Sequence, residues 1–80
     1  MIRFDDLWSK TAGEQLDALP AAVRDQVEAL VRQICADPMS HPEAAGIRRT
    51  RVARDGRATV LFQVDELERL VYVRGVDWRA

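Results

Sequence analysis

Residues 55–66 read DGRATVLFQVDE, a tight-turn signal followed by a strand pattern. Asp-Gly at positions 55 and 56 is a favoured dipeptide in the short loops of β-hairpins. Beyond the turn the side chains alternate between two faces, with Val60, Phe62 and Val64 on one and Thr59, Leu61 and Gln63 on the other. The stretch therefore predicts the turn and second arm of a β-hairpin.

Strand patterns also flank this stretch on both sides. From Ile47 the sequence takes on a period of two, which predicts a strand over residues 47–54. After an acidic turn at residues 64–68, the text RLVYVRGV predicts a strand over residues 69–76. With a central strand at residues 58–64, the C-terminal half is expected to form a three-stranded antiparallel meander.

The N-terminal half carries helical patterns. Thr11 and Glu14 have the spacing of a capping box and predict a short helix of about three turns. Pro20 fits the first position of a second helix, which ends at Asp37-Pro38 because the residue before a proline avoids the α region. The amphipathic face of the second helix carries Val23, Val27, Leu30, Val31 and Ile34.

The first residues complete the predicted architecture. Ile2 to Trp8 alternates imperfectly and predicts a short edge strand or an extended arm. The order is then a short strand, a helical hairpin and a three-stranded meander that forms a small sheet. This is an α+β fold, expected as a single domain over residues 1–80.

Charge is distributed unevenly along the chain. The net charge is −1, which argues against a general nucleic-acid binder. Five of the ten residues from Arg48 to Arg57 are nevertheless arginine, and residues 46–80 carry the excess of positive charge. Because a guanidinium offers five donors in a planar fork, such a cluster suits phosphate or carboxylate recognition.

Cysteine and histidine are scarce. A single cysteine, Cys35, cannot form an internal disulfide, and no apolar stretch is long enough for a signal peptide or a membrane span. We therefore expect a cytoplasmic protein, with Cys35 as a packing residue. No Cys/His grouping has metal-ligand spacing and no glycine-rich loop cradles phosphate, so no cofactor or metal is predicted.

The order of the segments ALPAAVRDQVEALVRQICADP, DGRATVLFQVDE and RLVYVRGVDWR resembles the RelE/ParE superfamily of bacterial toxins over nearly the whole chain. The resemblance implies the toxin of a type II toxin–antitoxin pair, neutralised by an antitoxin whose C-terminal segment wraps it. Members of the RelE branch cleave mRNA in the ribosomal A site. Members of the ParE branch inhibit DNA gyrase.

The resemblance also implies site residues. The two basic residues of the family's second strand match Arg49 and Arg51, which are two apart and so are expected on one strand face. Arg54 and Trp78 join them as predicted phosphate- or antitoxin-binding residues. Arg79 matches the arginine near the end of the last strand, and the family's remaining arginine falls on Thr59. Arg57 could take the place of this family arginine if the turn carries a bulge. On that condition, Arg57 and Arg79 are the predicted catalytic residues.

These predicted site residues include no group that readily transfers a proton, since an arginine does not readily yield its proton. The family's catalytic tyrosine or histidine lies on a tail that has no counterpart after Ala80. Tyr72, Asp55 and Asp77 could be proposed for proton transfer. A core or edge position explains Tyr72 better, however, as a turn does for Asp55 and a strand-end charge for Asp77. His41, the single histidine, is expected to be a surface loop residue. Trp8 and Trp78 could stack on bases, but they are expected to anchor the sheet ends or to contact a partner.

Two functions remain open. The first is a ribosome-dependent mRNA endonuclease that inhibits translation, which the arginine pattern favours. The second is a non-enzymatic inhibitor of DNA gyrase, or a silent member that only binds its antitoxin. No membrane partner is expected.

Overall fold

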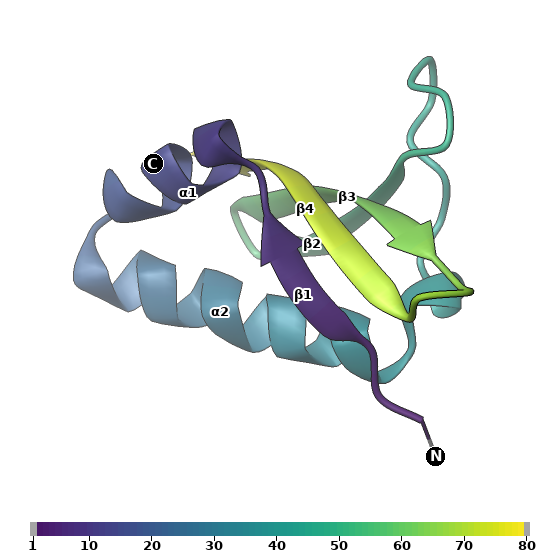
Figure 1. Ribbon diagram of the computed structural model, residues 1–80. Helices are drawn as coiled ribbons and strands as arrows, with labels where there is room; N and C mark the ends of the chain where they lie inside the picture. Colours follow the sequence, from purple (N-terminus) through teal and green to yellow (C-terminus); the bar gives the residue numbers. More distant parts are fainter. Residues whose placement is uncertain (1, 80) are drawn as a thin grey trace.

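The hairpin predicted from residues 55–66 supplies one edge strand and its neighbour in a four-stranded sheet of the computed structural model, which describes residues 2–79 (Figure 1). The strand order is β1-β4-β3-β2, in which β2, β3 and β4 form an antiparallel meander and β1 adds parallel to β4. The elements in chain order are β1 (Asp5–Trp8), α1 (Lys10–Asp17), α2 (Ala21–Ala36), a 3-10 turn (Pro38–Ser40), β2 (Arg51–Asp55), β3 (Ala58–Asp65) and β4 (Leu70–Trp78). The α+β prediction and the meander are confirmed.

The β2–β3 turn explains why glycine follows Asp55. Asp55 pairs directly with Ala58, so only Gly56 and Arg57 lie in the loop. Gly56 has a φ of 60°, a left-handed conformation that costs a residue without a Cβ little. The Asp-Gly turn signal therefore predicted the hairpin correctly.

The core lies between α2 and one face of the sheet. Phe62 is the largest fully buried side chain, and it packs in a single cluster with the apolar face of α2 and the inward residues of β3 and β4, which are Val27, Leu30, Val31, Ile34, Val60, Val71, Val73 and Val76. Burial of each such side chain contributes about 1.5–3 kcal/mol. The predicted amphipathic face of α2 is confirmed.

A β-bulge in β4 changes which residues face this core. Leu61 pairs with Gly75, but Phe62 pairs with Val73, so Arg74 is an extra residue in β4. As a result Val73 and Val76 both face the core although they are an odd number of positions apart. Regular alternation along this strand would place Tyr72 on the same face as Val76, but because of the bulge Tyr72 lies on the opposite face and is 39% exposed.

Three element boundaries differ from the predicted ones. Ser9, not Thr11, caps α1, and its side chain accepts a hydrogen bond from the Ala12 backbone N–H at 3.1 Å. The helix has 8 residues and is therefore shorter than the predicted three turns. Pro20 is the N-cap residue of α2 rather than its first helical residue.

The first half of the strand predicted at residues 47–54 is a loop. β2 begins at Arg51, and Arg49 has a φ of 58°, which no extended strand residue adopts. A backbone hydrogen bond of 2.9 Å from Val52 N–H to the Pro42 carbonyl ties the loop to β2, and within the loop Ala44 N–H donates to the Thr50 carbonyl at 2.7 Å. Residues 41–50 therefore form an anchored loop rather than an extension of the sheet.

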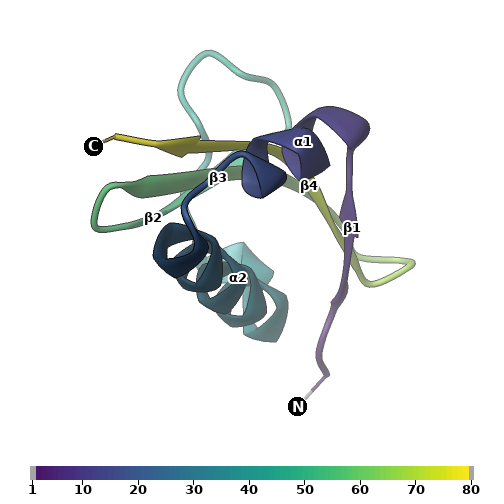
Figure 2. The same ribbon diagram turned by 90° about the vertical axis from the view of Figure 1, so that its left-hand side faces the viewer.

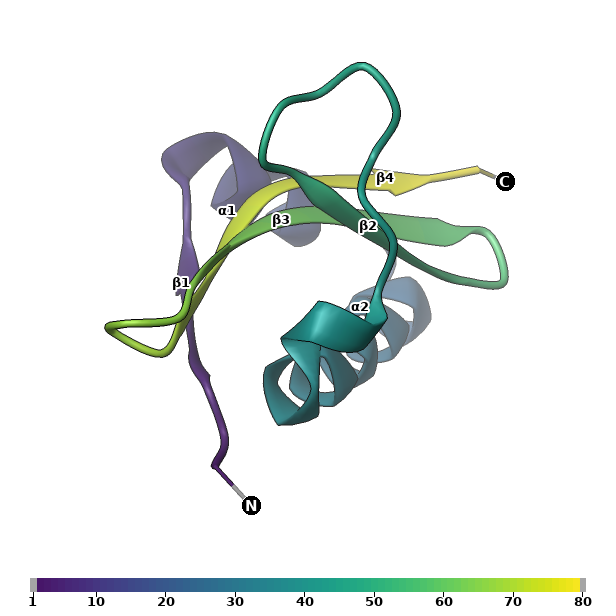
Figure 3. The same ribbon diagram turned by 90° about the vertical axis from the view of Figure 1, so that its right-hand side faces the viewer.

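This loop and α2 lie on opposite sides of the sheet, as Figures 2 and 3 show. We call the sheet face opposite α2 the open face. Within residues 2–79 no helix is long and apolar enough to cross a membrane.

Candidate functional site

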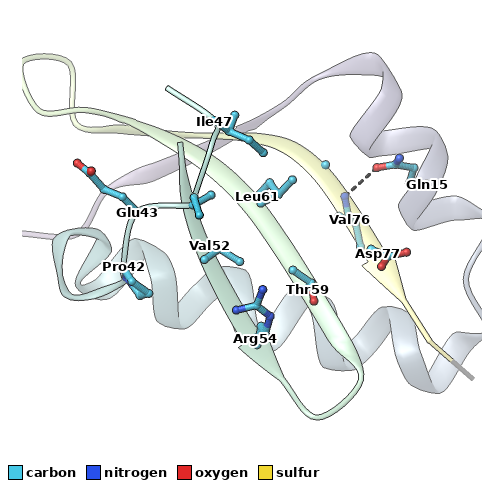
Figure 4. Close-up of a pocket in the computed structure, with 13 residues that line it drawn as sticks. Gln15, Pro42, Glu43, Ile47, Val52, Arg54, Thr59, Leu61, Val76 and Asp77 are labelled. Carbon is cyan, nitrogen blue, oxygen red and sulfur yellow. Dashed lines mark hydrogen bonds between the residues drawn. The ribbon is translucent and has the colours of Figure 1, made fainter. Parts of the chain in front are cut away.

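A groove of about 620 Å³ lies on the open face over β2, β3 and β4 (Figure 4). The strands supply its floor, with Val52, Arg54, Thr59, Leu61, Gly75, Val76 and Asp77. The 41–50 loop supplies one wall with Pro42, Glu43, Ala44, Ala45 and Ile47, and Gln15 of α1 supplies the other. The groove is thus formed by segments from most of the chain.

Strand pairing arranges the floor in two rows. In one row Val52 pairs with Leu61, and Leu61 pairs with Gly75, which leaves an apolar surface. In the next row Arg54 pairs with Thr59, and Thr59 pairs with Asp77. Because the rows are two residues apart, about 6.8 Å separates the apolar part of the groove from its polar end.

Further arginines lie at this polar end. Arg57 occupies the β2–β3 turn, and its carbonyl accepts a hydrogen bond of 3.1 Å from the Arg79 backbone N–H. In Figure 3 the end of β4 lies beside that turn. We call Arg54, Arg57 and Arg79 the arginine end of the groove. Within residues 2–79 the one ion pair joins Lys10 to Glu14, so none of these guanidinium groups is paired to a carboxylate of that part of the chain.

The other arginines of the basic run point elsewhere. Arg51 pairs with Phe62, on the side of β2 that faces the core, and its guanidinium donates to the His41 carbonyl at 2.6 Å. Arg49 lies in the loop and lines a second hollow with Leu7 and Tyr72. The prediction that Arg49 and Arg51 share one strand face was wrong, because the chain leaves the strand before Arg51.

Arg57 does not take the place of Thr59. The pairs Arg54–Thr59 and Asp55–Ala58 follow one another without a shift, so the turn has no bulge that would bring Arg57 into the strand. Thr59 therefore lies between Arg54 and Asp77 with a hydroxyl where the resemblance places an arginine. Trp78 pairs with Ala58, which is fully buried, and does not line the groove.

Among the candidates for proton transfer, Asp77 alone lines the groove. Tyr72 lies in the second hollow, where the Arg74 guanidinium sits 5.5 Å from its ring centroid. Asp55 belongs to the turn. His41 packs edge-on against Phe62 at 5.8 Å between ring centroids.

Cys35 is buried at the end of α2, as expected of a packing residue. Burial raises the pKa of its thiol, and the nearby Asp6 carboxylate raises it further. Within residues 2–79, no group of three or more His, Cys, Asp and Glu side chains is placed to hold a metal ion.

The contribution of Gln15 and of the loop was not predicted. Gln15 reaches the groove because α1 covers the edge of β4 beyond the end of β1, where the Gln15 side chain accepts a hydrogen bond from the Val76 backbone N–H at 2.7 Å. Glu43 and Ile47 reach it because the loop folds back over β2. Neither contact has a local sequence signal, since both join segments far apart in the chain.

No protein-family model and no curated protein matches the sequence. Solved structures do match. A chain of the toxin–antitoxin complex RelBE2 of Mycobacterium tuberculosis superimposes with a TM-score of 0.88 at 22% identity, over 98% of this chain and 100% of that one. A chain of the intact E. coli RelBE complex gives 0.78 at 16% identity, over 96% of this chain and 98% of that one.

The isolated E. coli RelE toxin is also similar, with a TM-score of 0.80 at 15% identity over 96% of this chain and 85% of that one. These matches confirm, at the level of the fold, the resemblance carried by the helical hairpin and the meander. Across almost its entire length, the chain has the fold of the RelE toxins.

Proposed function

We propose that this chain is the toxin component of a type II toxin–antitoxin pair and that its groove binds RNA, which it cleaves as a ribosome-dependent mRNA endonuclease. Support for the toxin role comes from the fold, since the similar solved chains come from RelE toxin and from toxin–antitoxin complexes. Support for the RNA chemistry comes from one observation. Arg54, Arg57 and Arg79 lie at the end of the groove that also carries Thr59 and Asp77.

Cationic side chains at this position suit a phosphodiester that is being cleaved. Attack on phosphorus adds negative charge to the phosphoryl oxygens, and preorganised guanidinium donors stabilise that charge. Arg54 lines the groove, whereas Arg57 and Arg79 do not line it and are joined by a backbone hydrogen bond beyond its polar end. Arg54 is therefore the arginine that we expect to contact the scissile phosphate.

The charge of the groove also explains why the proposed nuclease depends on the ribosome. Its lining holds one arginine, Arg54, and two carboxylates, Glu43 and Asp77. Such a groove attracts free polyanions weakly. RNA that is already held by a ribosome does not depend on this attraction, because the ribosome supplies the positioning.

An antitoxin segment would find apolar anchoring sites on the same face. Leu7, Ile47, Leu67 and Tyr72 are all large apolar or aromatic residues that are between 39% and 96% exposed. Leu7, Leu67 and Tyr72 line the second hollow, and Ile47 lines the groove. An antitoxin segment that covers the second hollow and the whole length of the groove would also cover the arginine end. Such a segment would keep RNA away from Arg54, which fits neutralisation by an antitoxin.

The test is induced expression of the wild type, Arg54→Ala and Arg32→Ala. Arg32 is an exposed arginine of α2, on the other side of the sheet, and serves as the matched control. We expect growth arrest and codon-positioned mRNA cleavage with the wild type and with Arg32→Ala. Arg54→Ala is expected to cleave at least about 10-fold more slowly. Intact transcripts together with rising DNA-damage signalling would refute the nuclease and point to a gyrase-type inhibitor.

A further inference from the structure

We propose that Asp77 is the general base that activates the RNA 2′-hydroxyl for cleavage. This inference rests on the proposed nuclease function and supplies the proton acceptor that arginines cannot provide. The residue lines the groove one strand away from Thr59 and two strands away from Arg54.

The spacing of the row fits a nucleotide. Neighbouring strands are about 4.8 Å apart, so the backbones at Arg54 and Asp77 are separated by roughly 10 Å. If the long Arg54 side chain contacts the phosphate from one side of the groove, the ribose of the same nucleotide lies toward the short Asp77 side chain on the other side. Figure 4 shows Arg54, Thr59 and Asp77 side by side across the three strands.

Other acid–base groups are placed less well. Glu43 also lines the groove, but it lies on the loop at the flank opposite Asp77 (Figure 4). Tyr72 lies in the separate second hollow, and His41 packs against Phe62. Within residues 2–79, Asp77 is thus the one groove carboxylate at the arginine end.

The reaction balances with these groups and one water. The Asp77 carboxylate takes the proton of the 2′-hydroxyl, and the 2′-oxygen forms a bond to phosphorus. The bond from phosphorus to the 5′-oxygen then breaks, and the leaving oxygen takes a proton from water. Arg54 neutralises the charge on the phosphoryl oxygens, and the Thr59 hydroxyl offers one further donor. The products are a 2′,3′-cyclic phosphate and a 5′-hydroxyl, and Asp77 returns its proton to solvent.

The experiment compares Asp77→Asn with Asp55→Asn in ribosome-dependent mRNA cleavage. Asp55 is an exposed aspartate at the same end of the sheet that does not line the groove, so both variants lose the same charge. We expect Asp77→Asn to lower the cleavage rate by about 100-fold or more, and Asp55→Asn to stay within about 2-fold of the wild type. Asp77→Glu, which keeps the carboxylate, is expected to recover part of the rate. Ribosome binding by Asp77→Asn should be unchanged.

The pH profile separates a base from a structural residue. A general base loses its function when it is protonated, so the pH–rate profile of Asp77→Asn should lack a limb that the wild-type profile has. A substrate with a 2′-deoxyribose at the cleaved position should stay intact with every variant. If Asp77→Asn and Asp77→Ser both cleave like the wild type while Arg54→Ala does not, Asp77 is not the base and the nuclease proposal stands. If the wild type cleaves nothing, the nuclease proposal itself fails.

Discussion

The side-chain oxygen of Gln15 lies 2.7 Å from the backbone nitrogen of Val76, and this hydrogen bond joins α1 to β4 two residues after the bulge at Arg74. The bond satisfies a backbone donor at an edge where no strand pairs with β4, because β1 ends at Trp8 opposite Val73. It also holds the residue that precedes Asp77. The groove thus depends on a helix that contributes a single side chain to its wall.

Replacing Gln15 by Ala should destabilise the fold by about 1–3 kcal/mol, because the partly buried Val76 N–H loses its acceptor. Urea unfolding measures the change as a lower midpoint. Gln33→Ala is the control, since Gln33 is an exposed glutamine of α2. Equal midpoints for the two variants would mean that water replaces Gln15 without loss.

Two glycines should respond in opposite directions to alanine. Gly56→Ala should destabilise by about 1–2 kcal/mol, because its φ is +60° and a Cβ would lie 3.2 Å from the Gln26 side-chain nitrogen. Gly13→Ala should stabilise by about 0.5–1 kcal/mol, because Gly13 lies within α1 and a Cβ there would meet no atom within 4 Å. Thermal unfolding of both variants checks the pair. A loss of stability on Gly13→Ala would contradict this account.

Thr59→Arg should increase the affinity of the groove for RNA. The substitution adds a second guanidinium to the groove, at the position between Arg54 and Asp77. In the wild type the groove lining has two carboxylates, Glu43 and Asp77, and one cation, Arg54. Binding of a short RNA, measured against salt concentration, should tighten and show a steeper salt dependence, by about one additional phosphate contact. Thr11→Arg adds the same charge on the exposed surface of α1 and should leave binding almost unchanged. Identical salt slopes for the two variants would argue that RNA does not occupy the groove.

Alkaline pH should weaken the fold through Cys35. Burial raises the pKa of the folded thiol above 9.0, its ordinary value, so the folded chain keeps a proton that the unfolded chain releases. This contribution to stability is complete below pH 9.0 and is lost as the pH rises through the folded pKa. Urea midpoints from about pH 8 upward should therefore fall more steeply for the wild type than for Cys35→Ala. Parallel curves would show that the thiol does not titrate differently in the two states.

The second helix and the β2–β3 hairpin were predictable because their signals are local. The apolar spacing from Val23 to Ile34 and the Asp55-Gly56 turn each lie within one element, and α2 and β3 formed where these signals indicated. The break before Pro38 is local in the same sense.

The path of the arginine run was not predictable. Ile47, Arg49 and Arg51 alternate as strand residues do, but the chain turns at Gly46 and Arg49, both of which have positive φ. The loop is fixed by a hydrogen bond from Val52 of β2 and by hydrogen bonds between its own backbone groups, which the alternation of its side chains does not indicate. The β4 bulge also escaped detection, because nothing near Arg74 indicates that Gln15 and Ser9 will meet its free edge.

The site was predicted in part. Arg54 lies in the groove and the backbones of Arg57 and Arg79 meet, but Arg49 and Arg51 lie apart from them. The sequence offered Asp77 as a strand-end charge. Its place opposite Thr59 depends on the register of β3 and β4, which the bulge sets.

The parallel pairing of β1 with β4 has a consequence for how the molecule forms. Asp5 pairs with Leu70, so β1 stays without its partner strand until residues 6–69 have been synthesised. At about 5–20 residues per second that delay lasts several seconds. Pairing between segments this far apart in the chain is also slow, because the loop-closure entropy is lost before any pairing energy is gained. The floor of the groove includes Asp77 of β4, so a nascent chain that has been synthesised only as far as β3 does not possess the groove.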